Sequence, residues 1–346
     1  MNNFIGRIEL IFGPMFAGKT TELIRRIQRA EKANLKCIII KYSNDDRYSN
    51  DCISTHDLTM RKATPTNKLT PLESLCSKFD VIGIDEGQFF PDIIEFCENL
   101  VSFGKTLIIA GLNGSFQAKP IGKIINLISK CETITKLSAI CVETGKEASF
   151  TQRTIDSTDI ELIGGGDIYR AASRNIFYGV SHSGEIHLTL GPAKSGKTTE
   201  LIRLLFRHKI AKKKPILLYP KKSQFKNEIK FETKPISELP SYDSLKDYDV
   251  IGIDEAQNYQ NLPDWCNHLA NSGKLVIISA LSGDTNQEAF APIINVFPLC
   301  ERIKLLDSIC PLIGAPAPFN IMFNNMVIPI SRFGLSHIQN LTVKNE

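Results

Sequence analysis

Short runs of aliphatic residues recur along the first half of the chain, each bounded by polar residues or by glycine. Four of these runs are expected to form buried strands, at residues 8–12, 37–42, 81–85 and 106–112. Residues 19–32 are expected to form a helix, and residues 91–104 form another because proline stands at their start and glycine at their end. Continuous Val- and Ile-rich strands separated by helices are typical of a parallel sheet covered on both faces. The pattern therefore predicts an α/β fold.

The whole pattern occurs twice. Two segments of the first half return in the second: GKTTELIRRIQRAEK at 18–32 as GKTTELIRLLFRHKI at 196–210, and FDVIGIDEGQFF at 79–90 as YDVIGIDEAQNY at 248–259. A period of this length is far longer than a solenoid repeat. We therefore predict a domain duplication, with a first copy over residues 1–182 and a second copy over residues 183–346. The Gly- and Ser-containing segment 179–185 would join them.

Composition changes this picture little. The 346 residues are 42% hydrophobic, enough for two domains with their own cores, and a net charge of +4 requires no polyanionic partner beyond nucleotide phosphates. The sequence begins without a secretory signal, and no apolar stretch is long enough to cross a bilayer. The nine cysteines are scattered without a C-x-x-C pair, which is typical of reduced thiols. We expect a cytoplasmic protein with no membrane or nucleic-acid partner.

Each copy carries a phosphate-binding sequence directly after a predicted strand. GPMFAGKT at 13–20 and GPAKSGKT at 191–198 both fit the pattern G-x-x-x-x-G-K-[ST]. In such a P-loop the glycines let backbone N–H groups point at phosphates, and the next helix adds partial positive charge from its N-terminus. Lys19 would reach the β- and γ-phosphates and Thr20 would hold Mg²⁺. The first copy is therefore predicted to bind ATP or GTP.

An acidic pair follows the third predicted strand. Asp85 would bind Mg²⁺ beside the P-loop, directly or through water. Adjacent strand residues point to opposite faces, so Glu86 is expected to have a different role and to take a proton from the group that attacks the γ-phosphate. A water attacker would make the protein an ATPase, and a substrate hydroxyl would make it a kinase. A helicase-like tandem ATPase is the rival interpretation, but helicase cores carry one P-loop, and the first copy lacks a late Arg-rich motif.

Further segments of the first copy resemble the type II thymidine kinases, the cellular and poxviral family. The matching segments, in chain order, are GPMFAGKTTELIRR, KYSNDDRY, THD, VIGIDEGQFFPDIIEFCE, FQAKP, KEASFTQR and IELIGGGDIY. This resemblance implies transfer of the ATP γ-phosphate to the 5′-hydroxyl of thymidine or deoxyuridine, giving dTMP in nucleotide salvage. It also implies a RecA-like P-loop fold, a mostly parallel sheet with helices on both faces, duplicated in tandem, with a small lasso-type extension in the first copy.

The resemblance assigns roles to individual residues. Glu86 would be the catalytic base, Lys19 would bind the phosphates, and Arg47, paired with Asp45 in a D-x-R segment, would steady the γ-phosphate. The expected residues around ATP and Mg²⁺ are Gly13, Met15, Gly18, Lys19, Thr20, Asp45, Arg47, Asp85 and Gln88, with Thr20 and Asp85 holding the metal. The expected residues around thymidine are Met15, Phe89, Leu112, Phe116, Thr151, Leu162, Gly164 and Tyr169.

Zinc is the point at which this chain departs from the family it resembles. The family anchors its lasso with Zn²⁺ held by two Cys-x-x-Cys or Cys-x-x-His pairs, which would fall at Cys141 with Thr144 and at Ser173 with Ile176. One thiol remains among the four positions, and a structural zinc site needs all four ligands. We therefore expect no structural zinc, with packing or the second copy holding the lasso instead.

The second copy keeps only part of the predicted site. Four polar residues of the phosphate site remain: Lys197, Thr198, Asp254 and Glu255. The D-x-R segment is replaced by YPKKSQFKNE, the aromatic residue at the position of Phe116 is lost, and no IGGxDxY follows Cys310. We expect the second copy to serve in folding and assembly, with a second active site of different specificity and regulatory nucleotide binding as the alternatives. The family's homo-oligomers imply a homodimer that forms a pseudo-tetramer, and the family implies dTTP as a feedback inhibitor.

Overall fold

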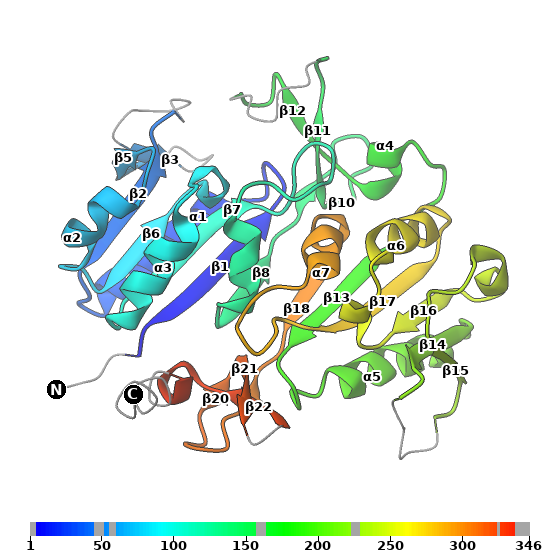
Figure 1. The fold of residues 1–346 in the computed structure, drawn as a ribbon. Coiled ribbons are helices and arrows are strands. Elements are labelled where there is room, and N and C mark those ends of the chain that lie inside the picture. The colour runs from blue at the N-terminus through cyan, green and yellow to red at the C-terminus, as the bar shows by residue number, and fades with distance from the viewer. Residues whose placement is uncertain are drawn as a thin grey trace.

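Two six-stranded parallel sheets lie at the centre of the molecule (Figure 1). The computed structural model describes residues 5–44, 52–54, 60–156, 164–222, 229–323 and 326–335. Strand order is β5-β2-β6-β7-β1-β8 in the first sheet and β15-β14-β16-β17-β13-β18 in the second, so the two sheets have equivalent topology. The predicted α/β fold and its tandem duplication are confirmed.

The elements have the following bounds. The first sheet contains β1 (Arg7–Gly13), β2 (Cys37–Tyr42), β5 (Thr64–Thr66), β6 (Val81–Ile84), β7 (Thr106–Leu112) and β8 (Thr133–Lys136). The second contains β13 (Ile186–Gly191), β14 (Pro215–Pro220), β15 (Glu232–Ile236), β16 (Val250–Ile253), β17 (Leu275–Leu281) and β18 (Arg302–Leu305). The helices are α1 (Lys19–Lys32), α2 (Glu73–Cys76), α3 (Ile93–Ser102), α4 (Arg174–Tyr178), α5 (Lys197–Ile210), α6 (Leu262–Asn271) and α7 (Ala291–Val296). Antiparallel pairs are β3 (Cys52–Ser54) with β4 (Met60–Lys62), β9 (Ala139–Ile140) with β10 (Glu147–Ala148), β11 (Phe150–Arg153) with β12 (Tyr169–Ala172), β19 (Ser308–Ile309) with β20 (Pro316–Ala317), and β21 (Phe319–Phe323) with β22 (Met326–Ile330).

Both faces of the first sheet are buried, which explains the continuous aliphatic runs. Neighbouring residues Leu10 and Ile11 of β1 are both fully buried but belong to different apolar clusters. The Ile11 cluster includes Leu23 and Ile27 of α1, so this helix covers one face. The Leu10 cluster includes Phe96, in the middle of α3, so this helix covers the other face. A strand between two such layers cannot alternate apolar and polar residues.

A hairpin extends from each copy. In the first copy β11 pairs with β12, from Phe150 opposite Ala172 to Arg153 opposite Tyr169. In the second copy β21 pairs with β22 in the same way, but residues 324–325 alone connect the strands. The sequence predicted a lasso-type extension for the first copy and did not predict the hairpin of the second copy. The second copy thus has the paired strands without the long connection.

The two copies share one apolar core. A single cluster of buried residues contains side chains from both sheets, and the rings of Phe12 and Phe297 meet edge to face with centroids 5.0 Å apart. The edge strands β8 and β18 lie side by side (Figure 1). Around the core, Asn113 of the first copy donates to the Pro298 carbonyl of the second, and Ser129 Oγ donates to the Gln287 carbonyl at 2.6 Å. The copies therefore pack as two halves of one body.

Composition also led to expectations about the thiols and about membrane spans. The eight cysteines whose side chains are described are all free thiols. Over the part of the chain that the structure describes, no helix is both long enough and apolar enough to cross a membrane.

The shared core predicts a large effect of truncating one of its aromatic side chains. Phe297→Ala should lower the free energy of unfolding by about 3–5 kcal/mol, because it leaves a cavity against Phe12. Phe103→Ala is the control, since that ring is 74% exposed, and it should change stability by no more than about 0.5 kcal/mol. Denaturant unfolding of both variants measures the difference. Equal midpoints for the two variants would contradict a core shared between the copies.

Candidate active site

The P-loop of the first copy joins β1 to α1. Phe16 and Gly18 both have left-handed backbone conformations, with φ of 65° and 76°. A Cβ at Gly18 would meet no atom within 4 Å, so the backbone conformation and not space favours glycine there. Lys19 is buried, and its Nζ donates to the Pro14 carbonyl at 2.8 Å. The lysine therefore lies over the loop whose backbone would cradle phosphates.

A hydroxyl and a carboxylate meet at the start of α1. Thr20 Oγ1 donates to Asp85 Oδ2 at 3.0 Å, and Asp85 is a buried residue directly after β6. Oxygen ligands of these two kinds are those that Mg²⁺ prefers beside a nucleotide. The residues present thus fit the metal that the sequence predicted.

Glu86 turns away from the strand that precedes it. Its backbone is left-handed, with φ 54° and ψ 42°, so it does not continue β6. Gln88 Nε2 donates to Glu86 Oε2 at 2.7 Å, and Gln88 Oε1 accepts the N–H of Leu112 at 3.0 Å. The Gln88 amide group is buried and bridges Glu86 to the end of β7, while its expected contact with ATP stays a prediction. The structure gives it the position of a support for Glu86.

The hairpin of the first copy is tied to the P-loop. Thr151 Oγ1 accepts the N–H of Met15 at 3.0 Å. Farther along β11, the Arg153 guanidinium lies 3.7 Å from the centroid of the Phe116 ring and donates to the Tyr169 hydroxyl at 2.8 Å. Four residues predicted around thymidine are therefore brought to one side of the loop.

Arg153 was missed by sequence reasoning. Its segment EASFTQR matches the resembled family without indicating a role for the arginine, and its partners Phe116 and Tyr169 lie on other segments. A guanidinium over an aromatic ring is a tertiary contact without a local sequence pattern.

The other predicted substrate residues have separate surroundings. The Phe89 ring stacks on Tyr42, with centroids 5.0 Å apart. Gly164 leaves room for a neighbour, because a Cβ there would lie 2.3 Å from Ile168 Cδ1. Packing against Ile168 therefore explains a glycine at this position, in addition to the predicted close approach of the backbone to thymidine. The predicted residues Asp45, Arg47 and Leu162 lie outside the described residues.

The four positions expected for zinc are close together in space. Thr144 Oγ1 and Ser173 Oγ lie 3.4 Å apart, and Ile176 packs against the cluster of Cys141. Burial raises the pKa of the Cys141 thiol, but hydrogen bonds from Thr144 and Ser173 outweigh burial and lower that pKa to about 6. Hydroxyl groups and apolar packing thus join β9–β10 to α4. Within the described residues, no group of three or more His, Cys, Asp or Glu is placed to hold a metal ion.

The second copy reproduces the phosphate loop. Lys194 and Gly196 have φ of 60° and 82°, and Thr198 Oγ1 donates to Asp254 Oδ2 at 2.8 Å. Burial lowers the pKa of Lys197 to about 8, and the nearby carboxylates of Asp254 and Glu255 oppose that shift.

The acceptor side is not reproduced. By the register of the repeats, Thr285, Met322 and Val327 stand where the first copy has Phe116, Arg153 and Tyr169. Met322 and Val327 are exposed. The second copy therefore has the phosphate side of the site without the aromatic side.

Fold and site together define a P-loop nucleotide-binding enzyme of the α/β class. The family model for thymidine kinase matches residues 6–177 and, a second time, residues 184–330. The chain belongs to the thymidine kinase family.

Curated relatives match about half of this chain. Thymidine kinase 1 of Dictyostelium discoideum is 51% identical over 176 residues, which are 50% of this chain and 78% of the relative. Thymidine kinase of Vaccinia virus (strain Ankara) is 50% identical over 174 residues, covering 50% of this chain and 98% of the relative. Thymidine kinase of Myxoma virus (strain Lausanne) is 49% identical over 173 residues, covering 50% and 97%.

The cluster around Cys141 predicts a lasso anchor without metal. Metal analysis of the purified protein should find far less than one zinc per chain, and a zinc chelator should leave the melting temperature unchanged. The reason is that two hydroxyls and an isoleucine replace three of the four ligands that tetrahedral zinc needs. About one tightly bound zinc per chain would show that this assignment is wrong.

Proposed function

We propose that the first copy transfers the γ-phosphate of ATP to the 5′-hydroxyl of thymidine, giving dTMP. The observation that carries this proposal is the placement of Glu86. Its carboxylate follows directly on the Asp85–Thr20 pair and is held by Gln88. Glu86 lies next to the phosphate site but is not part of the Thr20–Asp85 pair. Its carboxylate is therefore not needed for the proposed metal binding and suits a general base.

In the proposed reaction Glu86 accepts the proton of the 5′-hydroxyl as that oxygen attacks. The bond between the attacking oxygen and the γ-phosphorus forms, and the bond from that phosphorus to the β–γ bridging oxygen breaks, so ADP leaves with the electron pair. Lys19 holds the donor phosphates, and Arg47 steadies charge on the transferred group. Mg²⁺, held by Thr20 and Asp85, would offset the charge of the phosphates when bound.

The aromatic hairpin side is the proposed acceptor pocket. Arg153 and Tyr169 lie on the hairpin that Thr151 ties to Met15 of the P-loop, and the Arg153 guanidinium lies over the ring of Phe116, which follows β7. A planar nucleobase suits such a pocket, because aromatic rings and guanidinium groups can stack on the face of the nucleobase. Thymidine is the proposed substrate and deoxyuridine a second one, with the enzyme acting in nucleotide salvage.

The second copy is proposed to be inactive in transfer. It lacks the aromatic side of the site, and its retained loop also serves to join β13 to α5. We further propose that dTTP inhibits the first copy and that two chains associate as a homodimer, which would be a pseudo-tetramer of four α/β units.

A direct assay tests the central proposal. Purified protein is given labelled thymidine or deoxyuridine with ATP or GTP and Mg²⁺, and the monophosphate is followed. Formation of dTMP supports the proposal. Hydrolysis of ATP that does not depend on a nucleoside, without monophosphate, would instead favour the ATPase interpretation.

Replacing the proposed base should slow transfer without changing the shape of the site. Glu86→Gln keeps the size and a hydrogen-bonding oxygen but cannot accept the proton. Its kcat for thymidine phosphorylation should fall by roughly 10²–10⁴, the usual effect of removing a positioned base, while ATP binding persists. Near-normal turnover by this variant would remove Glu86 from the role.

The two P-loop lysines offer a matched comparison. Lys19→Ala should abolish thymidine phosphorylation, since alanine can neither reach nor neutralise the donor phosphates. Lys197→Ala, and likewise Glu255→Gln, should leave turnover within a few-fold of the unmodified protein because the second copy has no acceptor side. Steady-state kinetics of thymidine phosphorylation by the folded variants measures the difference. Loss of activity in Lys197→Ala with an intact fold would make the second loop a working site or a required regulator.

A further inference from the structure

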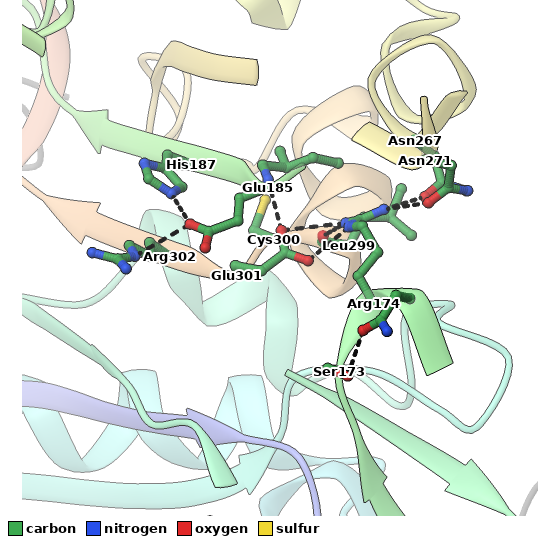
Figure 2. Close-up of polar contacts among 12 residues, drawn as sticks. Ser173, Arg174, Glu185, His187, Asn267, Asn271, Leu299, Cys300, Glu301 and Arg302 are labelled. Carbon is green, nitrogen blue, oxygen red and sulfur yellow. Dashed lines mark hydrogen bonds and ion pairs between the residues drawn. The ribbon is translucent and has the colours of Figure 1, made fainter. Parts of the chain in front are cut away.

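Arg174 connects the hairpin of the first copy to the second copy. It is the first residue of α4, directly after Ser173 and the end of β12, and it is 3% exposed (Figure 2). Its guanidinium donates five hydrogen bonds, and every acceptor belongs to the second copy. The acceptors are both carboxylate oxygens of Glu301, the side-chain oxygens of Asn267 and Asn271, and the carbonyl of Leu299 (Figure 2).

The same guanidinium holds the base of the hairpin. It lies 5.1 Å from the centroid of Phe150, the first residue of β11, and 5.3 Å from that of Tyr178. The residue after Phe150 is Thr151, which accepts the P-loop N–H of Met15. A continuous path of contacts therefore runs from the second copy through Arg174 and β11 to the proposed acceptor pocket.

The second copy contains the counterpart of this arrangement. Arg332 lies 4.7 Å from the centroid of Phe319 at the base of β21–β22, and its Nε donates to Glu132 of the first copy at 2.6 Å. Asn320 then accepts the P-loop N–H of Ala193 at 2.7 Å, as Thr151 does for Met15. Even the carboxylates correspond, because Glu301 accepts the N–H of Ile186 and Glu132 accepts that of Ile8.

We propose that Arg174 is a positioning residue through which the second copy holds the acceptor hairpin of the first copy in its working geometry. The inference rests on the proposed function for the identity of the acceptor. It gives the second copy a part in the reaction that needs no second active site. Since the counterpart arginine, Arg332, holds a hairpin without an aromatic side, the two arginines should differ in their effect on catalysis.

The test compares two matched double variants in the full chain. Arg174→Met/Glu301→Gln removes the pair that supports the acceptor hairpin, and Arg332→Met/Glu132→Gln removes its counterpart. Glutamine is included because burial raises the pKa of Glu301 and Arg174 opposes that shift, so a lone carboxyl left there would be costly. It also keeps an oxygen for the strand N–H of Ile186 or Ile8.

Two readouts separate positioning from simple stability. For the Arg174 variant, kcat/KM for thymidine should fall by roughly 10²-fold with a raised KM, whereas loss of folded enzyme would lower the apparent kcat alone. Amide hydrogen exchange should quicken in β11 and β12. For the Arg332 variant, exchange should quicken in β21 and β22, and kcat/KM should stay within a few-fold.

Three results would overturn the inference: equal losses of kcat/KM in both variants, an unchanged KM in the Arg174 variant, or unchanged exchange in β11 and β12. If the unmodified protein phosphorylates no thymidine, the proposed function fails, and the exchange comparison still decides whether Arg174 positions the hairpin. Should a double variant not fold, Arg174→Lys against Arg332→Lys carries the same comparison, because lysine keeps the charge but loses the forked donor geometry.

Discussion

The apolar core that the two copies share is the constraint on which the rest of this structure depends. A parallel sheet must be covered on both faces, and α1 covers one face of the first sheet. Helix α3 covers the other face, and the apolar cluster to which it belongs continues into the second copy, where Phe12 meets Phe297. Because the copies are related by duplication, the contacts are reciprocal, and each copy supplies both an arginine and a glutamate to the boundary. A change at one of these residues therefore removes a contact of both copies.

This constraint separates what the second copy has kept from what it has lost. Its P-loop retains the left-handed residues Lys194 and Gly196, and Lys197 Nζ donates to the Pro192 carbonyl as Lys19 does to Pro14. These contacts shape the connection between β13 and α5, so they have a structural use without any phosphate. Residues with no such use have changed, as Met322 at the position of Arg153 illustrates. Retention of a binding sequence is therefore weak support for retained catalysis here.

Much of the fold and part of the site could be predicted from local patterns. The helix at 19–32 and the strands at 37–42 and 106–112 have the predicted bounds, because aliphatic runs and turn residues report directly on neighbours in the chain. The P-loop and the Asp85–Glu86 pair were found for the same reason. The contacts of Arg153 and Arg174 could not be predicted, since their partners lie on other segments, up to 127 residues away for Arg174 and Glu301. No periodicity encodes which distant carboxylate a buried guanidinium will meet.

The β21–β22 hairpin of the second copy depends on contacts between distant segments and not on a local sequence motif. The IGGxDxY sequence is absent from the second copy, so nothing in its local pattern predicted a hairpin there. Yet β21 supplies Asn320 to the P-loop backbone and Phe319 to Arg332, and both contacts would be lost with the strands. Because both contacts come from β21 itself, the connection can shorten to residues 324–325 while the strands stay. In this chain the strands of the hairpin therefore belong to the fold, and the first copy differs by the Arg153 and Tyr169 side chains that its strands present to the proposed acceptor.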